Sequence, residues 1–231
     1  YYNVSSISGL SVAFQSIISQ IKKVNASYVS PVIPVSNMNH TYAGDSLYLG
    51  FFMPTLDGIW AGNVKKYGLS STGSIVDVNG NDATDPDGRI KNNAQSYWSD
   101  NEDGPDVIEG GLGALLLDNP NRNLYTYLGS QAALTHTENA FSVSNSLLTA
   151  AELDVDNDTE KNAVITDIIA LDKAWKMGDV LHSQPKVVGY DTDADGQEDE
   201  SYIFVGTNRG VMHAFKDSDG SESWGFVPRE Q

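Results

Sequence analysis

Residues 186–227 read KVVGYDTDADGQEDESYIFVGTNRGVMHAFKDSDGSESWGFV, and this stretch decides the predicted fold. Short runs rich in β-branched and aromatic residues are separated by turns rich in Asp, Asn and Gly, which indicates antiparallel strands. The four predicted strands are KVVGY (186–190), SYIFVGT (201–207), VMHAF (211–215) and SWGFV (223–227). Four evenly spaced strands are typical of one antiparallel unit such as a β-propeller blade, and the sequence holds no second copy of the pattern.

The connection between the first two of these strands is strongly acidic. With Asp191 as position 1, carboxylates fall at positions 1, 3, 5 and 9, and Gly196 falls at position 6. This is the first part of the calcium-loop pattern D-x-D-x-D-G, in which alternate side chains point inward and the glycine permits a sharp turn. Hard oxygen ligands that repel one another favour a hard dication, so the sequence predicts a Ca²⁺ site. The predicted ligands are Asp191, Asp193, Asp195, Gln197 through its main-chain carbonyl, and Asp199.

This loop departs from an EF-hand in two ways. Position 12 is Tyr202 where an EF-hand has a bidentate Glu, and the flanking segments are predicted strands where an EF-hand has helices. The prediction is therefore a β-hairpin held together by calcium, with an affinity on the order of micromolar to millimolar. The alternative interpretation is an acidic turn that is only solvated.

Two further acidic segments are weaker metal candidates. Residues 154–158 read DVDND and repeat the spacing of positions 1, 3 and 5, but they lack the glycine and lead directly into a predicted helix. A helix N-cap with an acidic first turn explains that segment about as well as a metal does. Residues 77–82 (DVNGND) and 85–88 (DPDG) are interpreted as turns.

The rest of the chain predicts a mainly β protein with a few helices. An amphipathic helix is expected over Gly9–Lys23, and a second helix is expected to run through Val164, Ile168, Leu171 and Trp175, with Gly178 just beyond its end. Strands are expected within residues 28–69, joined by a turn at Leu56–Gly58, and from Leu124 to Leu128. The aromatic and aliphatic residues expected to fill a core are Phe51, Trp60, Val64 and Tyr67.

Composition excludes several classes of function. The 231 residues include 31 acidic and 14 basic side chains, giving a net charge of −17, which argues against nucleic-acid binding and anionic membranes. There is no cysteine, and no run reaches the roughly 20 apolar residues of a membrane span. The first residues lack a basic segment and an initiator Met, so we expect a piece of a longer protein without a signal peptide.

Motifs for catalysis are sparse. The four histidines, at positions 40, 136, 182 and 213, show no metal-ligand spacing, and each is expected to be structural or to lie on the surface. The glycine cluster at Gly110–Gly113 lacks the βαβ context and the third glycine of a dinucleotide-binding loop. We therefore expect no enzymatic activity, no catalytic residues and no organic cofactor.

Three stretches together resemble a known family. GDVLHSQP (178–185), VGTNRG (205–210) and the acidic loop between them resemble the start of the C-terminal β-propeller of PilC/PilY-type proteins. These are secreted adhesins and assembly factors at the tip of bacterial type IV pili. Upstream, residues 47–69, 94–104 and 109–129 resemble the segment before that propeller, and Gly9–Lys23 resembles the end of a von Willebrand A-like domain.

The resemblance implies a domain order and a function. Residues 1–24 would end the A-like domain, 25–150 would form a β-rich domain, 151–177 a helical connection, and 178–231 the first propeller blade with its calcium hairpin. It implies a calcium-binding, non-enzymatic extracellular module for adhesion and pilus biogenesis, located at a pilus tip or in an extracellular filament. The implied partners are the remainder of the parent chain or other pilus subunits.

Two alternatives remain open. The stretch VGTNRGVMHAFKDSDGSESW (205–224) also resembles the tryptophan-docking motif of quinoprotein dehydrogenases, whose repeated blades enclose a quinone. A purely structural filament component is the other alternative. Further copies of the motif and a cofactor absorbance would favour the dehydrogenase, and a visible polymer would favour the filament.

Overall fold

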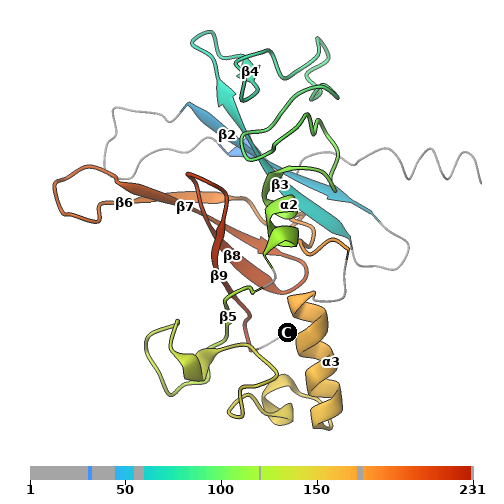
Figure 1. Cartoon of the computed structure of the whole chain (residues 1–231), viewed down its shortest axis with the longest axis vertical. Coiled ribbons are helices and arrows are strands. Elements are labelled where there is room, and N and C mark those ends of the chain that lie inside the picture. Colours follow the sequence, from blue (N-terminus) through green and yellow to red (C-terminus); the bar gives the residue numbers. More distant parts are fainter. Residues whose placement is uncertain (1–30, 33–44, 55–59, 120, 171–173, 230–231) are drawn as a thin grey trace, which may run out of the picture.

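The structure is a computed structural model that describes residues 31–32, 45–54, 60–119, 121–170 and 174–229 (Figure 1). Within these residues it is mainly β with two α-helices, and its strands form two open sheets. The predicted helix over Gly9–Lys23 and the predicted turn at Leu56–Gly58 lie outside the described residues. The mainly β class is confirmed, and the described strands close neither a barrel nor a propeller.

The first sheet is an antiparallel meander in the order β1-β2-β3-β4. Its strands are β1 (Pro31–Val32), β2 (Ser46–Met53), β3 (Ala61–Leu69) and β4 (Ile75–Val76). The long β2–β3 hairpin pairs Gly50 with Val64, and it is buried over most of its length on both faces. This agrees with the nearly continuous apolar and aromatic sequence of β2. Strand β3 is different, because it also buries the polar side chains of Asn63, Lys65 and Lys66.

The second sheet has the order β5-β9-β8-β7-β6. The four predicted strands are confirmed as β6 (Lys186–Tyr190), β7 (Glu200–Thr207), β8 (Val211–Lys216) and β9 (Glu222–Phe226), all antiparallel neighbours. The fifth strand, β5 (Leu124–Tyr125), adds parallel to β9 and comes from much earlier in the chain. The predicted strand from Leu124 is thus shorter than expected and belongs to this sheet.

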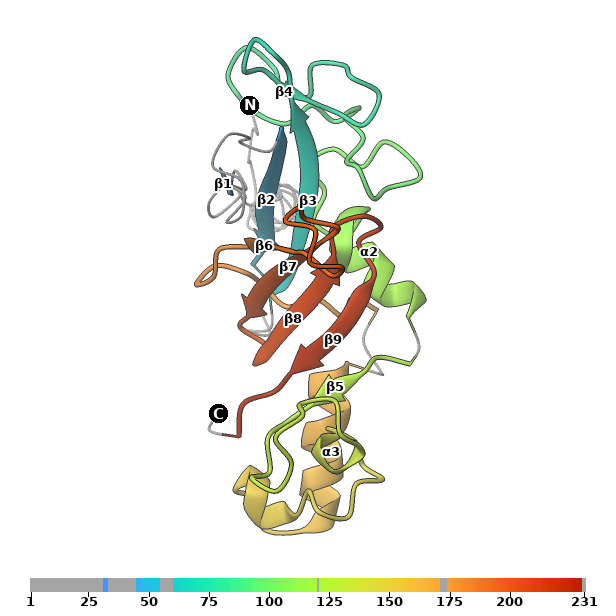
Figure 2. The same cartoon turned by 90° about the vertical axis from the view of Figure 1, so that its left-hand side faces the viewer.

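The helices are short and lie beside the sheets. They are α2 (Gly111–Asp118), α3 (Asp158–Ile169) and two 3-10 turns, Thr137–Asn139 and Ala150–Leu153. Figure 2 shows α3 packed with the chain that follows β5 at one end of the molecule, away from the first sheet.

The predicted second helix is wrong at its C-terminal end. The helix stops at Ile169, because Ala170 adopts a left-handed conformation with φ 56° and its amide caps the carbonyls of Thr166 and Asp167. Trp175 is instead drawn into the core between the sheets, where its indole Nε1 donates to the carbonyl oxygen of Gly62 at 2.8 Å. Gly178 therefore does not terminate this helix.

Three hydrophobic clusters form the interior, and one of them joins the two sheets. It brings Tyr48 and Val64 of the first sheet against Ile203, Val205 and Phe215 of the second, together with residues of α2 and of the segment before β6. A second cluster lies between the β2–β3 hairpin and residues 83–107, and a third packs α3 and β5 against the second sheet.

The predicted aromatic core is confirmed for three of its four members. Phe51, Val64 and Tyr67 are buried. Trp60 is only partly buried, since it lies at the beginning of the hairpin strand and stacks on Phe52 with ring centroids 5.8 Å apart.

Candidate metal centre

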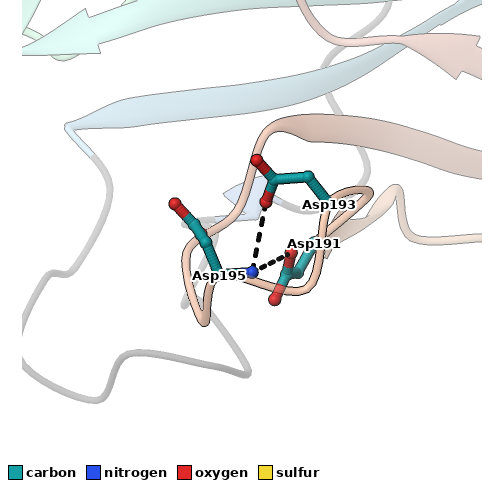
Figure 3. Close-up of side chains that lie close together, drawn as sticks. All are labelled: Asp191, Asp193 and Asp195. Carbon is teal, nitrogen blue, oxygen red and sulfur yellow. Dashed lines mark hydrogen bonds between the residues drawn. The ribbon is translucent and has the colours of Figure 1, made fainter.

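The acidic loop forms the tip of the β6–β7 hairpin. Carboxylate oxygens from Asp191, Asp193 and Asp195 lie within 4.8 Å of one another, and this is the only group of three or more such side chains with that geometry among the described residues. Figure 3 shows the three side chains on the same loop, with the main-chain nitrogen of Asp195 between the carboxylates of Asp191 and Asp193. Alternate residues converge because the loop is wound tightly, as the spacing predicted.

Hydrogen bonds from the main chain set this winding. The amide of Asp195 donates to Asp191 Oδ1 at 3.2 Å and to Asp193 Oδ1 at 3.1 Å (Figure 3). The amide of Gly196 donates to Asp191 Oδ2 at 2.8 Å. Gly196 has φ 91° with no atom near the position of a Cβ, so glycine is required there for its conformation and not for close packing.

The last predicted ligand, Asp199, is held differently. Its Oδ2 accepts hydrogen bonds from the amide and the hydroxyl of Thr192, both at 2.7 Å. These hydrogen bonds from Thr192 lower the pKa of the exposed Asp199 carboxyl. Asp199 therefore closes the loop across its base, while Asp191, Asp193 and Asp195 form the cluster. Gln197 lies in the same turn, and its amide donates to Asp195 Oδ1 at 2.8 Å.

The donor set suits a hard cation. Three carboxylates on an exposed loop offer oxygen ligands and negative charge, which Ca²⁺ prefers, and solvent can fill the remaining coordination positions. No Lys or Arg forms an ion pair with these three carboxylates among the described residues, so their repulsion is not offset by a side-chain cation.

The other acidic segments, residues 154–158, 77–82 and 85–88, form a helix N-terminus and two turns. Asn157 caps α3, since its side-chain oxygen accepts from the amides of Thr159 and Glu160, both at 3.0 Å. Asp77 and Asp85 each accept two main-chain amides within a tight turn, which confirms the turn interpretation for both segments. These carboxylates stabilise local backbone and do not converge on a common point.

A buried ionic cluster was not predicted from the sequence. Arg122 forms a bidentate salt bridge with Glu222, in which both N–O distances are 2.7 Å. His213 Nδ1 lies 2.7 Å from the same carboxylate. The three side chains are almost fully buried, and they join the start of β5 to β8 and β9. Local sequence patterns could not predict this cluster, because Arg122 and Glu222 are 100 positions apart in the chain.

Another buried pair supports the first sheet. Lys65 Nζ lies 3.0 Å from Asp103 Oδ2 and also donates to the carbonyls of Asp103 and Gly104. Burial lowers the pKa of Lys65, and the adjacent Asp103 opposes that shift. All donors of the lysine are used, which makes it a structural anchor for the segment around Asp103.

The histidines serve structural roles where they are described. His136 caps a 3-10 turn by accepting from the amide of Glu138, His213 joins the buried cluster, and His182 contacts Asn208 on the surface. His40 lies outside the described residues.

Comparisons of the chain with protein-family models, with curated proteins and with solved structures give no match. None of the helices in the described segments has the length and apolar character needed to cross a membrane.

Proposed function

We propose that this chain is a calcium-binding, non-enzymatic extracellular module of a type IV pilus tip adhesin or pilus biogenesis protein. The observation that carries the calcium part is the convergence of Asp191, Asp193 and Asp195 at the tip of a hairpin, in a D-x-D-x-D-G loop. The pilus part rests on the resemblance of the sequence motifs to PilC/PilY-type proteins.

The arrangement of the hairpin supports a structural role for the ion. The three carboxylates and the Gln197 carbonyl would hold Ca²⁺, while Asp199 keeps the two ends of the loop together through Thr192. Binding to the folded loop alone would stabilise the β6–β7 hairpin by mass action. In this proposal β6–β9 form the first blade of a propeller.

Isothermal titration of the 231-residue chain with Ca²⁺ tests the calcium part. We expect one site with a dissociation constant on the order of micromolar to millimolar. Asp193→Ala should abolish the calcium heats, because the change removes one of three converging ligands. Asp85→Ala is the matched control, since Asp85 lies in a D-x-D-G turn without a converging triad. Equal heats for Asp193→Ala and the unmodified chain would refute the assignment.

The pilus part needs a separate test. Antibodies raised against this chain should detect the parent protein in pili sheared from the cell surface. Detection only in cells that lack pili, or only inside the cell, would overturn this part of the proposal and leave calcium binding intact.

A further inference from the structure

Lys65 and Asp103 place an amine and a carboxyl group against each other inside the protein. Lys65 Nζ lies 3.0 Å from Asp103 Oδ2, and the two side chains are 0% and 3% exposed. Lys65 lies in the middle of β3, whereas Asp103 comes 38 positions later, in the segment that precedes α2. The pair therefore joins two separate parts of the chain at a point almost closed to solvent.

The interior weakens the preference of this pair for its charged form. Burial lowers the pKa of Lys65, and the neighbouring Asp103 carboxylate opposes that shift. Transfer of one proton from Nζ to Oδ2 removes both charges at once, and the desolvation cost of a buried ion pair falls with them. The neutral amine that results is a nucleophile, and it lies in contact with a neutral carboxylic acid.

The two oxygens of Asp103 have different hydrogen-bond donors, which suits them to different roles. Oδ1 accepts the main-chain amide of Ser96 at 2.8 Å. An amide in this position stabilises the negative charge that develops on a carbonyl oxygen during nucleophilic attack. Oδ2 accepts the hydroxyls of Ser96 and Ser99, at 2.8 and 2.9 Å. Because hydroxyl groups can relay protons, Oδ2 is the oxygen suited to leave as water.

We propose that Lys65 and Asp103 condense to form an isopeptide bond once the chain has folded. Nζ of the neutral lysine attacks Cγ of the protonated Asp103, the Nζ–Cγ bond forms, and the Cγ–Oδ2 bond breaks. Oδ2 leaves as one water molecule, with the proton of the carboxylic acid and one proton of the amine, and Oδ1 stays as the carbonyl oxygen of the new amide. The reaction uses no oxidant or cofactor, and contact between the two groups makes it intramolecular.

The surroundings can accommodate the amide. The lysine ammonium contacts the carbonyl oxygens of Asp103 and Gly104 at 2.8 and 2.9 Å, whereas an amide has one N–H to donate. The Gly104 carbonyl also accepts the Tyr67 hydroxyl at 3.4 Å, so the N–H can serve the carbonyl of Asp103. Removal of two buried charges offsets the weaker contact at Gly104. The bond would tie β3 to the segment before α2, and it depends neither on calcium nor on a pilus.

A second lysine–aspartate pair provides an internal control. Lys66 Nζ lies 2.8 Å from both carboxylate oxygens of Asp217, but these side chains are 11% and 20% exposed. Three aromatic rings lie within 5.7 Å of the Lys66 ammonium and favour its charged form, whereas the ring of Phe51 lies 5.6 Å from Lys65 Nζ. We therefore expect the Lys66–Asp217 pair to remain an ion pair, although its atoms are equally close.

Mass spectrometry of the purified 231-residue chain under denaturing conditions tests the proposal. We expect an intact mass lower than that of the sequence by one water molecule. Trypsin cleaves after Lys and Arg, so the bond should join the peptides 24–66 and 92–122 through a branch between Lys65 and Asp103. Fragmentation of the joined peptides locates the branch, and no branch should connect Lys66 with Asp217.

Two variants separate Lys65 from its neighbour. Lys65→Arg keeps the positive charge but presents a guanidinium that stays protonated, so this variant should keep its full mass. Lys66→Arg is the matched control and should still lose one water molecule. Circular dichroism verifies that each variant is folded, and the peptide map of the original sequence decides the question even if a variant does not fold.

An intact mass equal to that of the sequence would overturn the proposal and leave Lys65 and Asp103 as an ion pair. Asp103 precedes Gly104, and an Asp–Gly sequence can also lose water by closing to a succinimide. That product leaves the peptides 24–66 and 92–122 separate, and finding it would overturn the proposal. Loss of water from Lys65→Arg would overturn it as well.

Discussion

Asn63 shows how one buried side chain can organise a distant segment. It has no exposed surface, and its amide nitrogen lies 3.0 Å from the carbonyl oxygen of Val107 and 2.9 Å from that of Gly110. Its Oδ1 accepts the amide of Gly113 at 2.9 Å. Because α2 has no side-chain cap of its own, Asn63 on β3 acts as a cap supplied from another strand.

Asn63→Ala should lower the free energy of unfolding by about 2–4 kcal/mol. The change leaves the carbonyls of Val107 and Gly110 and the amide of Gly113, at the start of α2, without their hydrogen-bond partner. Chemical denaturation measures the change. Asn79→Ala is the control, since Asn79 is exposed and its side chain makes one hydrogen bond, to Gln95. A loss at Asn63 no larger than the loss at Asn79 would contradict this role.

The buried ionic cluster makes stability depend on pH. Burial alone raises the pKa of Glu222, but hydrogen bonds from Arg122 and His213 outweigh burial and lower this pKa to about 2. Burial lowers the pKa of His213, although its hydrogen bond with Glu222 opposes that effect. Both depressed pKa values mean that the unfolded chain binds more protons than the folded one, so stability falls as the pH falls.

Glu222→Gln should reduce the free energy of unfolding at pH 7 by about 3–5 kcal/mol, since it leaves the charge of Arg122 buried without its partner. The contribution of the carboxylate is complete above its unfolded pKa of about 4.3 and is lost as the pH falls towards 2. The difference between the variant and the unmodified chain should therefore shrink between about pH 5 and pH 2. Chemical denaturation at several pH values measures this difference, and Glu102→Gln at an exposed position is the control. A difference in the free energy of unfolding that stayed constant with pH would contradict the prediction.

At the scale of elements, α2 is fixed by a close contact that its sequence does not reveal. A Cβ on Gly113 would lie 2.1 Å from Cζ2 of Trp175, so the indole ring occupies the space that any larger residue needs. Trp175, which the apolar periodicity placed on the same helix, is thus used between the sheets, beyond the end of α3 at Ile169. Helical periodicity predicts a continuous apolar stripe, but it cannot show that a later member of the stripe packs elsewhere.

Gly113→Ala should destabilise the protein by about 1–3 kcal/mol, even though Gly to Ala within a helix ordinarily stabilises by about 1 kcal/mol. Trp175→Leu removes the ring that occupies the space. In the double variant Gly113→Ala with Trp175→Leu, the alanine should therefore cost much less than it does alone. Equal costs in both backgrounds, measured in a double-mutant cycle, would show that the contact is not responsible.

At the scale of the whole molecule, the turn between β8 and β9 connects the two sheets. Lys66 Nζ on β3 lies 2.8 Å from both carboxylate oxygens of Asp217 in this turn, and Tyr48 donates to the same carboxylate at 2.6 Å. The rings of Tyr48, Tyr97 and Trp98 lie within 5.7 Å of the ammonium group. An aromatic cage around a lysine thus joins the first sheet to the second.

Asp217→Ala should lower the free energy of unfolding by about 2–4 kcal/mol, because it leaves the mostly buried Lys66 without its counter-charge. Asp219→Ala in the same turn is the matched control and should cost about 1 kcal/mol, since the exposed Asp219 bonds Ser221 within the turn and holds no buried charge. Thermal or chemical unfolding measures both losses. Equal losses in the free energy of unfolding for Asp217→Ala and Asp219→Ala would contradict the role of the cage.

The sequence predicts local features of this fold better than distant ones. Strands β2, β3 and β6–β9 and the converging aspartates follow from short patterns, in which period and turn residues suffice. The addition of β5 to β9, the Arg122–Glu222–His213 cluster and the Lys66 cage depend on residues far apart in the chain. Such pairings are decided by tertiary packing, which no local pattern encodes. The hydrogen bonds that Asp199 Oδ2 accepts from Thr192 were likewise not predicted from the spacing, while the role of Asp199 as a ligand stays a prediction.

The parallel pairing of β5 with β9 also has a consequence for synthesis on the ribosome. Arg122 is made 100 residues before its partner Glu222, and Leu124 similarly precedes its partner Gly225. Loop-closure entropy must be overcome before such distant contacts form, so we expect the region that contains α3 to wait for β9 to emerge. During that interval the apolar side chains of Leu124, Phe141 and Ile165 lack Val211 and Val227, the residues of the later segment that they pack against in the complete fold. Apolar surface exposed in this way makes a folding intermediate prone to aggregation.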